Sequence, residues 1–200
     1  MVSSMSGKWQ ELKEAIDNIE SQLAQNNRPR PNETMCRLLI AGEDRRFALH
    51  PGVDPIAVIR AAWKTFLCAD RQGASTIAMQ LVRTITGRCE ITLRRKIQEM
   101  ILAVRLTHYL EKERLPLLYL WIGRYGWRMD GFSEACAALD IDPETVNHWQ
   151  AAELVARLKY PEPRRFNNPQ MLKIERRARH LVSLDHGAHK KRSFVPAQYS

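Results

Sequence analysis

The sequence predicts an all-α protein, on three observations. Apolar residues recur at three- and four-residue steps over most of the 200-residue chain, which is the period of an amphipathic helix. Strand signals, meaning short runs that alternate apolar and polar residues, are sparse. The apolar fraction of 44% is ordinary for a globular protein and, at this length, allows a sizeable core. We therefore expect roughly eight to ten helices in a single domain.

The N-terminal region is predicted to form one amphipathic helix over residues 7–25. Its apolar face is carried by Trp9, Leu12, Ile16, Ile19 and Leu23. Its polar face is net acidic, whereas a helix that lies in a membrane interface is normally basic on that face. We therefore expect this helix to pack on the domain body or on a partner helix. Residues 26–32 contain two prolines and several turn residues, which predicts a linker, so that residues 1–34 precede the main domain.

From Met35 onward the pattern is almost wholly helical. The predicted helices are 55–69, 75–86, 91–111, 113–122, 148–159 and 169–184, with breaks at Gly73, at Gly87 and over 123–131. Asp142-Pro143-Glu144-Thr145 is a helix-start signal and predicts one further short helix. Residues 35–184 thus form the main domain, and residues 185–200 are predicted to be a basic, disordered tail.

The charge balance indicates an anionic partner. The formal net charge is +9 and the isoelectric point is about 9.7. Nucleic acid, an anionic membrane surface and a phosphate-bearing substrate all satisfy this requirement. The basic residues form no evident recognition helix, so nucleic-acid binding is the least favoured of the three.

The cysteines and the hydropathy pattern narrow the class of protein further. Cys36, Cys68, Cys89 and Cys136 are widely separated and form no CxxC pair, which argues against a zinc ribbon or a thioredoxin-like motif. We expect buried free thiols. The sequence has no run of about 20 apolar residues and no signal-peptide core of roughly 7–15 apolar residues near its beginning. We therefore expect a soluble or peripheral protein.

The segment from Glu43 to Asp54 is the first of three that could carry chemistry. It follows the apolar run 38–41, so Glu43 is expected where a buried segment ends and a cleft begins. A carboxylate held partly out of water there is suited to general-base work near neutral pH. The alternative is a solvated loop, with Asp54-Pro55 as the start of the next helix. Its distinctive residues are Glu43, Asp44, Phe47, His50, Gly52 and Asp54.

The second segment, residues 72–83, combines a glycine with two hydroxyl residues at the start of a predicted helix. Ser75 or Thr76 can cap that helix. Thr76, Gln80 and Arg83 stand at i, i+4 and i+7, which places them on one helical face. Such a polar stripe near a helix N-terminus suits an anion such as pyrophosphate. The alternative is an ordinary capped surface helix.

The third segment is Arg94-Arg95-Lys96-Ile97-Gln98-Glu99. Glu99 stands four residues after Arg95 and three after Lys96, so salt bridges on a helix surface are a sufficient explanation. The functional alternative is a cationic patch with one carboxylate, able to hold a phosphate group directly or through a divalent metal.

Together these segments resemble the glycosyltransferase family 51 domain, the peptidoglycan glycosyltransferase that polymerises lipid II. The family motif EDxxFxxHxGxD is matched at every specified position within residues 43–54. GGSTIxQQ corresponds to 73–80 with Ala74 and Met79 as departures, and RKxxE corresponds to 95–99. YLNxxYxG is only partly kept at 119–126, where Trp121 replaces asparagine, and the AAxLA helix resembles 151–156. The resemblance covers about residues 35–184.

The resemblance implies a lysozyme-like helical head with a smaller jaw that dips into the membrane. It implies β-1,4 polymerisation of lipid II with inversion, Glu43 as general base, and Arg83, Arg95 and Lys96 as the groups that stabilise the pyrophosphate leaving group. Glu99 would position the donor or a divalent cation, Mg²⁺ or Mn²⁺. The remaining substrate-binding positions implied are Asp44, Phe47, His50, Ser75, Thr76 and Gln80.

The resemblance also implies where such a protein works and with what. Typical members act on the outer face of the cytoplasmic membrane and are anchored by a span. The expected partners are lipid II, the growing lipid-linked glycan chain, the membrane surface and an anchoring protein, with no nucleic acid. Because the sequence shows neither a span nor an export signal, either a partner tethers the chain, its jaw binds the membrane alone, or it is not a working polymerase. The alternative function is a catalytically weak relative that binds lipid II or glycan in an envelope assembly complex.

Overall fold

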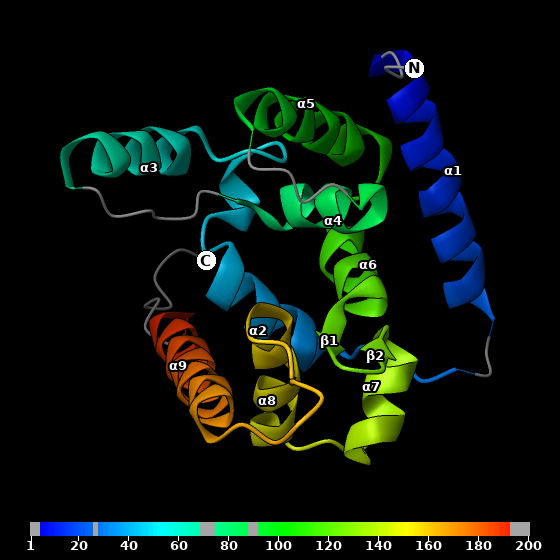
Figure 1. Cartoon of the computed structure of the whole chain (residues 1–200), viewed down its shortest axis with the longest axis vertical. Helices are drawn as coiled ribbons and strands as arrows, with labels where there is room; N and C mark the ends of the chain where they lie inside the picture. The colour runs from blue at the N-terminus through cyan, green and yellow to red at the C-terminus, as the bar shows by residue number, and fades with distance from the viewer. Residues whose placement is uncertain (1–4, 26–27, 69–74, 88–91, 193–200) are drawn as a thin grey trace, which may run out of the picture. The chain divides into compact units, whose positions relative to one another are not determined.

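A computed structural model describes residues 5–25, 28–68, 75–87 and 92–192 (Figure 1). The chain divides into two compact units. The first consists of the chain up to Arg28 together with Glu43–Tyr119, and the second consists of Pro29–Gly42 and the chain from Leu120 onward. Each unit is helical, which confirms the all-α prediction.

The first unit is built around the packing of three helices. Its elements are α1 (Met5–Ala24), the 3-10 turn η1 (Phe47–Leu49), α3 (Pro55–Cys68), α4 (Ile77–Thr86), α5 (Leu93–Tyr109) and the first part of α6 (Arg114–Ile122). α4 packs against both α5 and α1, and Figure 1 shows α4 and α5 side by side. The apolar face predicted for α1 is largely confirmed, because Leu12, Ile16 and Leu23 are almost fully buried.

Local sequence signals set where these helices begin. Thr76 caps α4 by accepting a hydrogen bond from the backbone N–H of Met79, and Thr92 caps α5 in the same way with Arg95. Asp54 accepts hydrogen bonds from the backbone N–H groups of Ile56 and Ala57 at the start of α3. These caps explain why the predicted and observed helix starts agree within a few residues. Gly73 and Ala74 lie outside the described residues.

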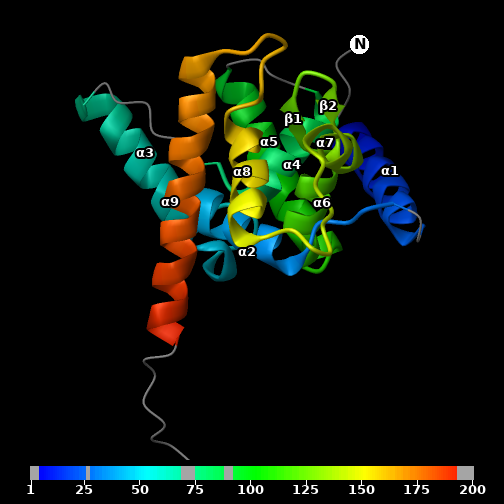
Figure 2. The same ribbon diagram turned by 90° about the horizontal axis from the view of Figure 1, so that it is seen from below.

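The second unit contains α2 (Glu33–Glu43) up to Gly42, the antiparallel pair β1 (Arg124–Gly126) and β2 (Met129–Asp130), α7 (Phe132–Leu139), α8 (His148–Lys159) and α9 (Asn168–Arg192). α8 and α9 form the most extensive helix pair in the unit, and Figure 2 shows them side by side. α7 and α8 both contact β1. The structure therefore adds a short hairpin and α7 to the helices predicted from sequence.

Two predictions in this unit are wrong. The helix predicted to begin at Asp142 is a single turn, in which the Asp142 carboxylate accepts from the backbone N–H of Glu144 and from the Thr145 hydroxyl. No helix continues from that turn, because Asn147 caps the start of α8 a few residues later and forms a capping box with Gln150. The part of the predicted tail from residue 185 to Arg192 is helical, and residues 193–200 lie outside the described residues. Asp185 holds that end of α9 because it is buried and paired with His148.

The remaining sequence expectations concern thiols and membrane spans. Cys136 is buried and Cys36 half-buried, and both are free thiols. The side chain of Cys68 and the whole of Cys89 lie outside the described residues. Within the described ranges, no helix combines the length and the apolar character needed to cross a bilayer.

Candidate active site

The carboxylate of Glu43 stands at the end of α2 and is held by α4. The side-chain amide of Gln80 donates a hydrogen bond of 3.0 Å to Oε2 of Glu43. Glu43 is half-buried and Gln80 is 8% exposed. A polar amide this deeply buried needs a partner, so the bond favours one orientation of the Glu43 side chain. The Glu43 carboxylate is therefore held in one orientation by Gln80 and is still partly exposed to solvent.

Asp44, the next residue, ties the same loop to the start of α4. Its Oδ1 lies 2.8 Å from Nε2 of His50, and its Oδ2 accepts a hydrogen bond of 3.2 Å from the backbone N–H of Ile77. Asp44 and His50 are both buried. The first backbone N–H of α4 is thus bonded to the protein's own carboxylate. His50 Nδ1 is buried and has no hydrogen-bond partner among the described residues.

Lys112 fixes the outer part of this loop and was not recognised from the sequence. Its Nζ donates a hydrogen bond of 2.6 Å to the backbone carbonyl of His50 and lies 5.0 Å from the centre of the Phe47 ring. The two contacts join the connection between α5 and α6 to η1. A single lysine between two helices has no spacing or pattern that would have revealed this role.

Gly52 and Thr76 make the closest approach between the loop and the α4 start. The Thr76 hydroxyl donates a hydrogen bond of 2.5 Å to the carbonyl of Gly52. Gly52 has φ +90°, and a Cβ there would lie 2.5 Å from the carbonyl oxygen of Ala103. Only glycine fits, for both conformational and steric reasons. Asp54 then uses its second oxygen for an ion pair of 3.1 Å with Arg46.

A basic cluster at the start of α5 surrounds the second glutamate. Arg95 pairs with Oε2 of Glu99 at 2.5 Å, and Lys96 pairs with Oε1 at 3.0 Å. Lys96 also donates a hydrogen bond of 2.8 Å to the hydroxyl of Ser75. Glu99 is only 4% exposed, so these are not simply surface salt bridges. The segment before α4 and the start of α5 are therefore joined at this cluster.

The pKa values of Lys96 and Tyr119 are both shifted, and Arg83 contributes to each shift. Burial lowers the pKa of Lys96, Glu99 partly restores it, and the positive charges of Arg83 and Arg95 lower it again. Burial, with the negative charge of Glu43, raises the pKa of Tyr119 to about 12, while Arg83 opposes that rise. Arg83 therefore acts electrostatically both on Lys96 of the basic cluster and on Tyr119, which Glu43 also influences.

Glu99 does not fit a resident divalent cation. Both of its carboxylate oxygens are already engaged by basic side chains, and Mg²⁺ prefers several oxygen ligands. Within the described ranges, no group of three or more His, Cys, Asp or Glu side chains is placed to hold a metal ion. The Mg²⁺ or Mn²⁺ expected from the resemblance stays a prediction.

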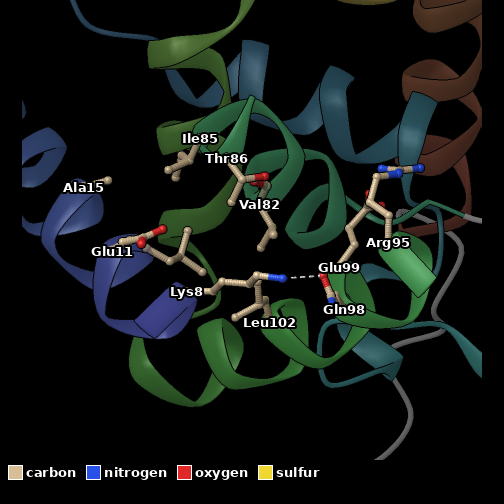
Figure 3. A pocket seen from close by; sticks show the side chains of 11 residues that line it. Lys8, Glu11, Ala15, Val82, Ile85, Thr86, Arg95, Gln98, Glu99 and Leu102 are labelled. Carbon is tan, nitrogen blue, oxygen red and sulfur yellow. Dashed lines mark hydrogen bonds and ion pairs between the residues drawn. The ribbon is translucent and has the colours of Figure 1, made fainter. Parts of the chain in front are cut away.

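A cavity of about 200 Å³ lies on the α1 side of the cluster (Figure 3). Arg95, Gln98 and Glu99 line it from α5, and Val82, Ile85 and Thr86 line it from α4. The buried Lys8 reaches across from α1 and donates a hydrogen bond of 2.7 Å to Gln98. Glu43 and Gln80 do not line this cavity, so it is separate from the base.

The structure brings together the site residues that the sequence singled out. All of them lie in the first unit. Hydrogen bonds, ion pairs or a cation–ring contact connect Glu43, Asp44, Phe47, His50, Ser75, Thr76, Gln80, Arg95, Lys96 and Glu99. Arg83 joins them through its electrostatic influence on Lys96 and Tyr119. The residues that resemble YLNxxYxG (119–126) and AAxLA (151–156) lie in the second unit, apart from Tyr119.

Several known proteins are similar to this chain in sequence. The chain is 42% identical over 117 residues to penicillin-binding protein 1A of Escherichia coli (strain K12), which covers 56% of this chain and 14% of that protein. It is 36% identical over 146 residues to the biosynthetic peptidoglycan transglycosylase of Bordetella avium (strain 197N), covering 69% and 59% of the two chains. It is also 36% identical over 119 residues to penicillin-binding protein 1C of Escherichia coli (strain K12), covering 58% and 15%.

In each of these comparisons the matched region spans less than two thirds of the relative. The family model named Transglycosylase, in contrast, matches residues 10–184, which include most of α1 and all of the site described above. That match extends over far more than half of the 200 residues. The chain belongs to the transglycosylase family.

Proposed function

We propose that this chain polymerises lipid II into β-1,4-linked glycan strands with inversion at the anomeric carbon. One observation carries the proposal. Glu43 is hydrogen-bonded to Gln80 of α4, while Ser75, just before α4, is hydrogen-bonded to the Lys96–Glu99–Arg95 cluster of α5. The proposed base and the proposed cationic site are thereby both bonded to residues of the packed pair α4 and α5 or of the segment just before α4.

The chemistry requires one strong proton acceptor. The 4-hydroxyl of the acceptor sugar loses its proton to Glu43 as its oxygen attacks the anomeric carbon of the donor. The new carbon–oxygen bond forms as the bond to the pyrophosphate breaks, and attack from the opposite side of the ring inverts the configuration. The leaving pyrophosphate is already a stable anion, so no general acid of the glycosidase kind is needed.

The basic residues supply what the leaving group needs instead. Arg83, Arg95 and Lys96 carry three positive charges against the single negative charge of Glu99, so the cluster keeps a net charge of about +2 for the pyrophosphate. Glu99 orients Arg95 and Lys96 through its two oxygens. Fixed charges of this kind stabilise the developing anion without reorganising during the reaction.

The proposed function also implies a cellular location and partners. The chain acts at the periplasmic face of the bacterial inner membrane, where lipid II and the growing lipid-linked glycan chain are its substrates. It contacts the membrane surface and an anchoring protein partner. These statements rest on family membership together with the basic character of the chain.

Polymerisation of labelled lipid II by the purified protein in detergent, with Mg²⁺ present, tests the proposal. The parent should form glycan product, and Glu43→Gln should reduce the rate by about 10²–10⁴-fold, the usual contribution of a general base. Glu33→Gln is the matched control, since Glu33 lies on the same helix and its side chain is 86% exposed. Product from Glu43→Gln at the parental rate would contradict the assignment of the base. If the parent binds lipid II without forming product, the catalytically weak relative is the correct alternative.

A further inference from the structure

The turn between β1 and β2 carries a tryptophan and an arginine on the surface of the second unit. Gly126 pairs with Met129 across the hairpin, so Trp127 and Arg128 form the turn. Trp127 is 44% exposed, and Arg128 is exposed as well. Arg128 has a left-handed backbone with φ +59°, which glycine or asparagine adopts at lower cost in such turns. The fold therefore does not require an arginine at this position, and its side chain needs another explanation.

A second arginine, Arg164 in the segment after α8, contacts the same ring. The guanidinium carbons of Arg128 and Arg164 lie 4.9 Å and 5.3 Å from the centre of the Trp127 ring, which are cation–π distances. Arg164 is also exposed. Neither arginine forms an ion pair with an acidic residue in the described part of the chain. Two positive charges are thus held at one exposed ring without a carboxylate of this chain to neutralise them.

Glu162 fixes this arrangement by joining the hairpin to the end of α8. Its carbonyl accepts a hydrogen bond of 2.8 Å from the Trp127 N–H, and its own N–H donates one of 2.9 Å to the Tyr125 carbonyl. Its carboxylate pairs at 2.8 Å with Arg157 of α8, whose side chain is buried. Gly126 allows the close approach, because a Cβ there would lie 2.7 Å from the Glu162 carbonyl oxygen. The turn and the segment after α8 are therefore held together by the backbone, independently of any ligand.

We propose that Trp127, Arg128 and Arg164 form a docking site for an acidic segment of a partner protein. Each guanidinium can take a carboxylate through two parallel hydrogen bonds. Tryptophan and arginine are the side chains that most often dominate the binding energy of protein interfaces. Because the ring already orders both guanidiniums, binding loses little side-chain freedom. The net charge of +9 attracts an acidic segment from a distance and so favours its encounter with the site.

The exposure of the tryptophan favours a protein segment over a small anion. A free phosphate ion would neutralise the arginines but would leave the Trp127 ring in contact with water. A peptide that carries apolar side chains beside its carboxylates covers the ring and pairs with both arginines. The site contains no residue of the Glu43 or Glu99 clusters, which lie in the first unit. Docking at this site is therefore a function additional to polymerisation and does not depend on it.

Fluorescence anisotropy with the full chain tests the site. The probe is a short fluorescein-labelled peptide of alternating glutamate and leucine. The double variant Arg128→Gln, Arg164→Gln should bind this peptide at least about tenfold more weakly than the parent. Arg60→Gln, Arg105→Gln is the charge-matched control, because it removes two exposed arginines of the first unit. The control should lose less than about threefold, since it changes the net charge equally but leaves the site intact.

Trp127→Leu separates an organised site from a general attraction between opposite charges. It keeps every charge of the chain and removes the ring that both guanidiniums contact. We expect this variant, folded by circular dichroism, to bind the peptide about three- to tenfold more weakly than the parent. If it binds as the parent does, or if the site pair Arg128→Gln, Arg164→Gln loses no more than the control pair, the docking site is overturned. The comparison of the two arginine pairs decides the matter even if Trp127→Leu does not fold.

Two other anions serve as competitors of the labelled peptide: inorganic phosphate, and vesicles of phosphatidylglycerol and phosphatidylcholine. We expect neither to displace the peptide at physiological salt, because neither offers carboxylates next to apolar side chains. If either displaces it and binds the parent through Arg128 and Arg164, a phosphate group is the ligand and the assignment to an acidic protein segment is overturned.

Polymerisation of lipid II in detergent separates this site from the proposed function. Arg128→Gln, Arg164→Gln should keep the polymerisation rate within about twofold, because neither residue belongs to the Glu43 or Glu99 clusters. A loss of tenfold or more would show that the two arginines serve the reaction, and would overturn the docking site. Peptide binding that depends on these arginines, in a parent that forms no product, would overturn the proposed function alone.

Discussion

The Gln80 amide and the Glu43 carboxylate are joined by a hydrogen bond of 3.0 Å between two residues 37 positions apart. Gln80 is held in turn by α4, whose capping residue Thr76 is bonded to the Gly52 carbonyl. The orientation of the proposed base therefore depends on a helix from another motif, and not on its own loop alone.

Gln80→Leu should lower kcat about 10- to 100-fold and change KM little, because it removes the group that orients Glu43 while keeping the side-chain volume. The measurement is the initial rate of lipid II polymerisation over a range of substrate concentrations. Thr84→Val is the control. Thr84 lies one turn after Gln80 on α4, and its hydroxyl donates a hydrogen bond to the backbone carbonyl of Gln80, so this variant leaves the Gln80 side chain and its bond to Glu43 in place. A rise in KM with unchanged kcat would mean that Gln80 binds substrate without orienting the base.

Glu99→Gln should lower kcat at least about tenfold, because Arg95 and Lys96 lose the carboxylate that orients them. The cluster also becomes more positive, so inorganic pyrophosphate should inhibit the variant more strongly than the parent. Rates measured at several pyrophosphate concentrations check both expectations. The same variant tests the divalent cation: we expect its dependence on Mg²⁺ concentration to match that of the parent, and a large shift would show that Glu99 holds the ion.

Gly52→Ala should destabilise the protein by about 2–5 kcal/mol, since it combines a left-handed backbone with a clash at the Ala103 carbonyl. Gly87→Ala is the matched control, because Gly87 also has a positive φ of +62° but a Cβ there meets no atom within 4 Å. That variant should lose only about 1–2 kcal/mol. Urea unfolding of both variants measures the difference, and equal losses would show that the contact with α5 is not tight.

Lys112→Met should lower stability by about 1.5–3 kcal/mol and reduce the polymerisation rate. It removes the charged hydrogen bond to the His50 carbonyl and the contact with the Phe47 ring. Lys112→Arg keeps the charge and should restore part of both losses. If the methionine variant loses stability but keeps full activity, Lys112 supports the fold without positioning the loop that carries Glu43 and Asp44.

The free energy of unfolding should fall as the pH rises from 9 towards 12. Burial raises the pKa of the Cys136 thiol to about 12 and that of Cys36 to about 11, from an ordinary value of 9.0. Above pH 9 the unfolded chain releases these protons before the folded chain does, so stability present below pH 9 is lost as pH rises. Urea unfolding at several pH values should show a shallower loss for Cys136→Ala than for the parent. Parallel curves would contradict a buried thiol at this position.

The helix boundaries were largely predictable because they depend on short-range signals. Thr76 and Thr92 cap their helices as isolated sequence features, and apolar spacing marks the faces of α1 and α8. Short-range signals gave a wrong prediction at Asp142, because a turn and a helix begin with the same hydrogen bonds. Asp142 makes the first hydrogen bonds of either a turn or a helix, and nothing within four residues decides which one follows.

The sequence by itself determined the helical fold, the chemical character of the three motifs and the family to which they belong. Only the tertiary structure decided that Gln80 orients Glu43, that Lys96 joins Ser75 to Glu99, and that Lys112 holds the His50 loop. It also decided which apolar face of α5 is buried and which is exposed. The physical reason is distance along the chain: periodicity and capping act over one or two turns, whereas these contacts join residues that only the packing of helices brings together.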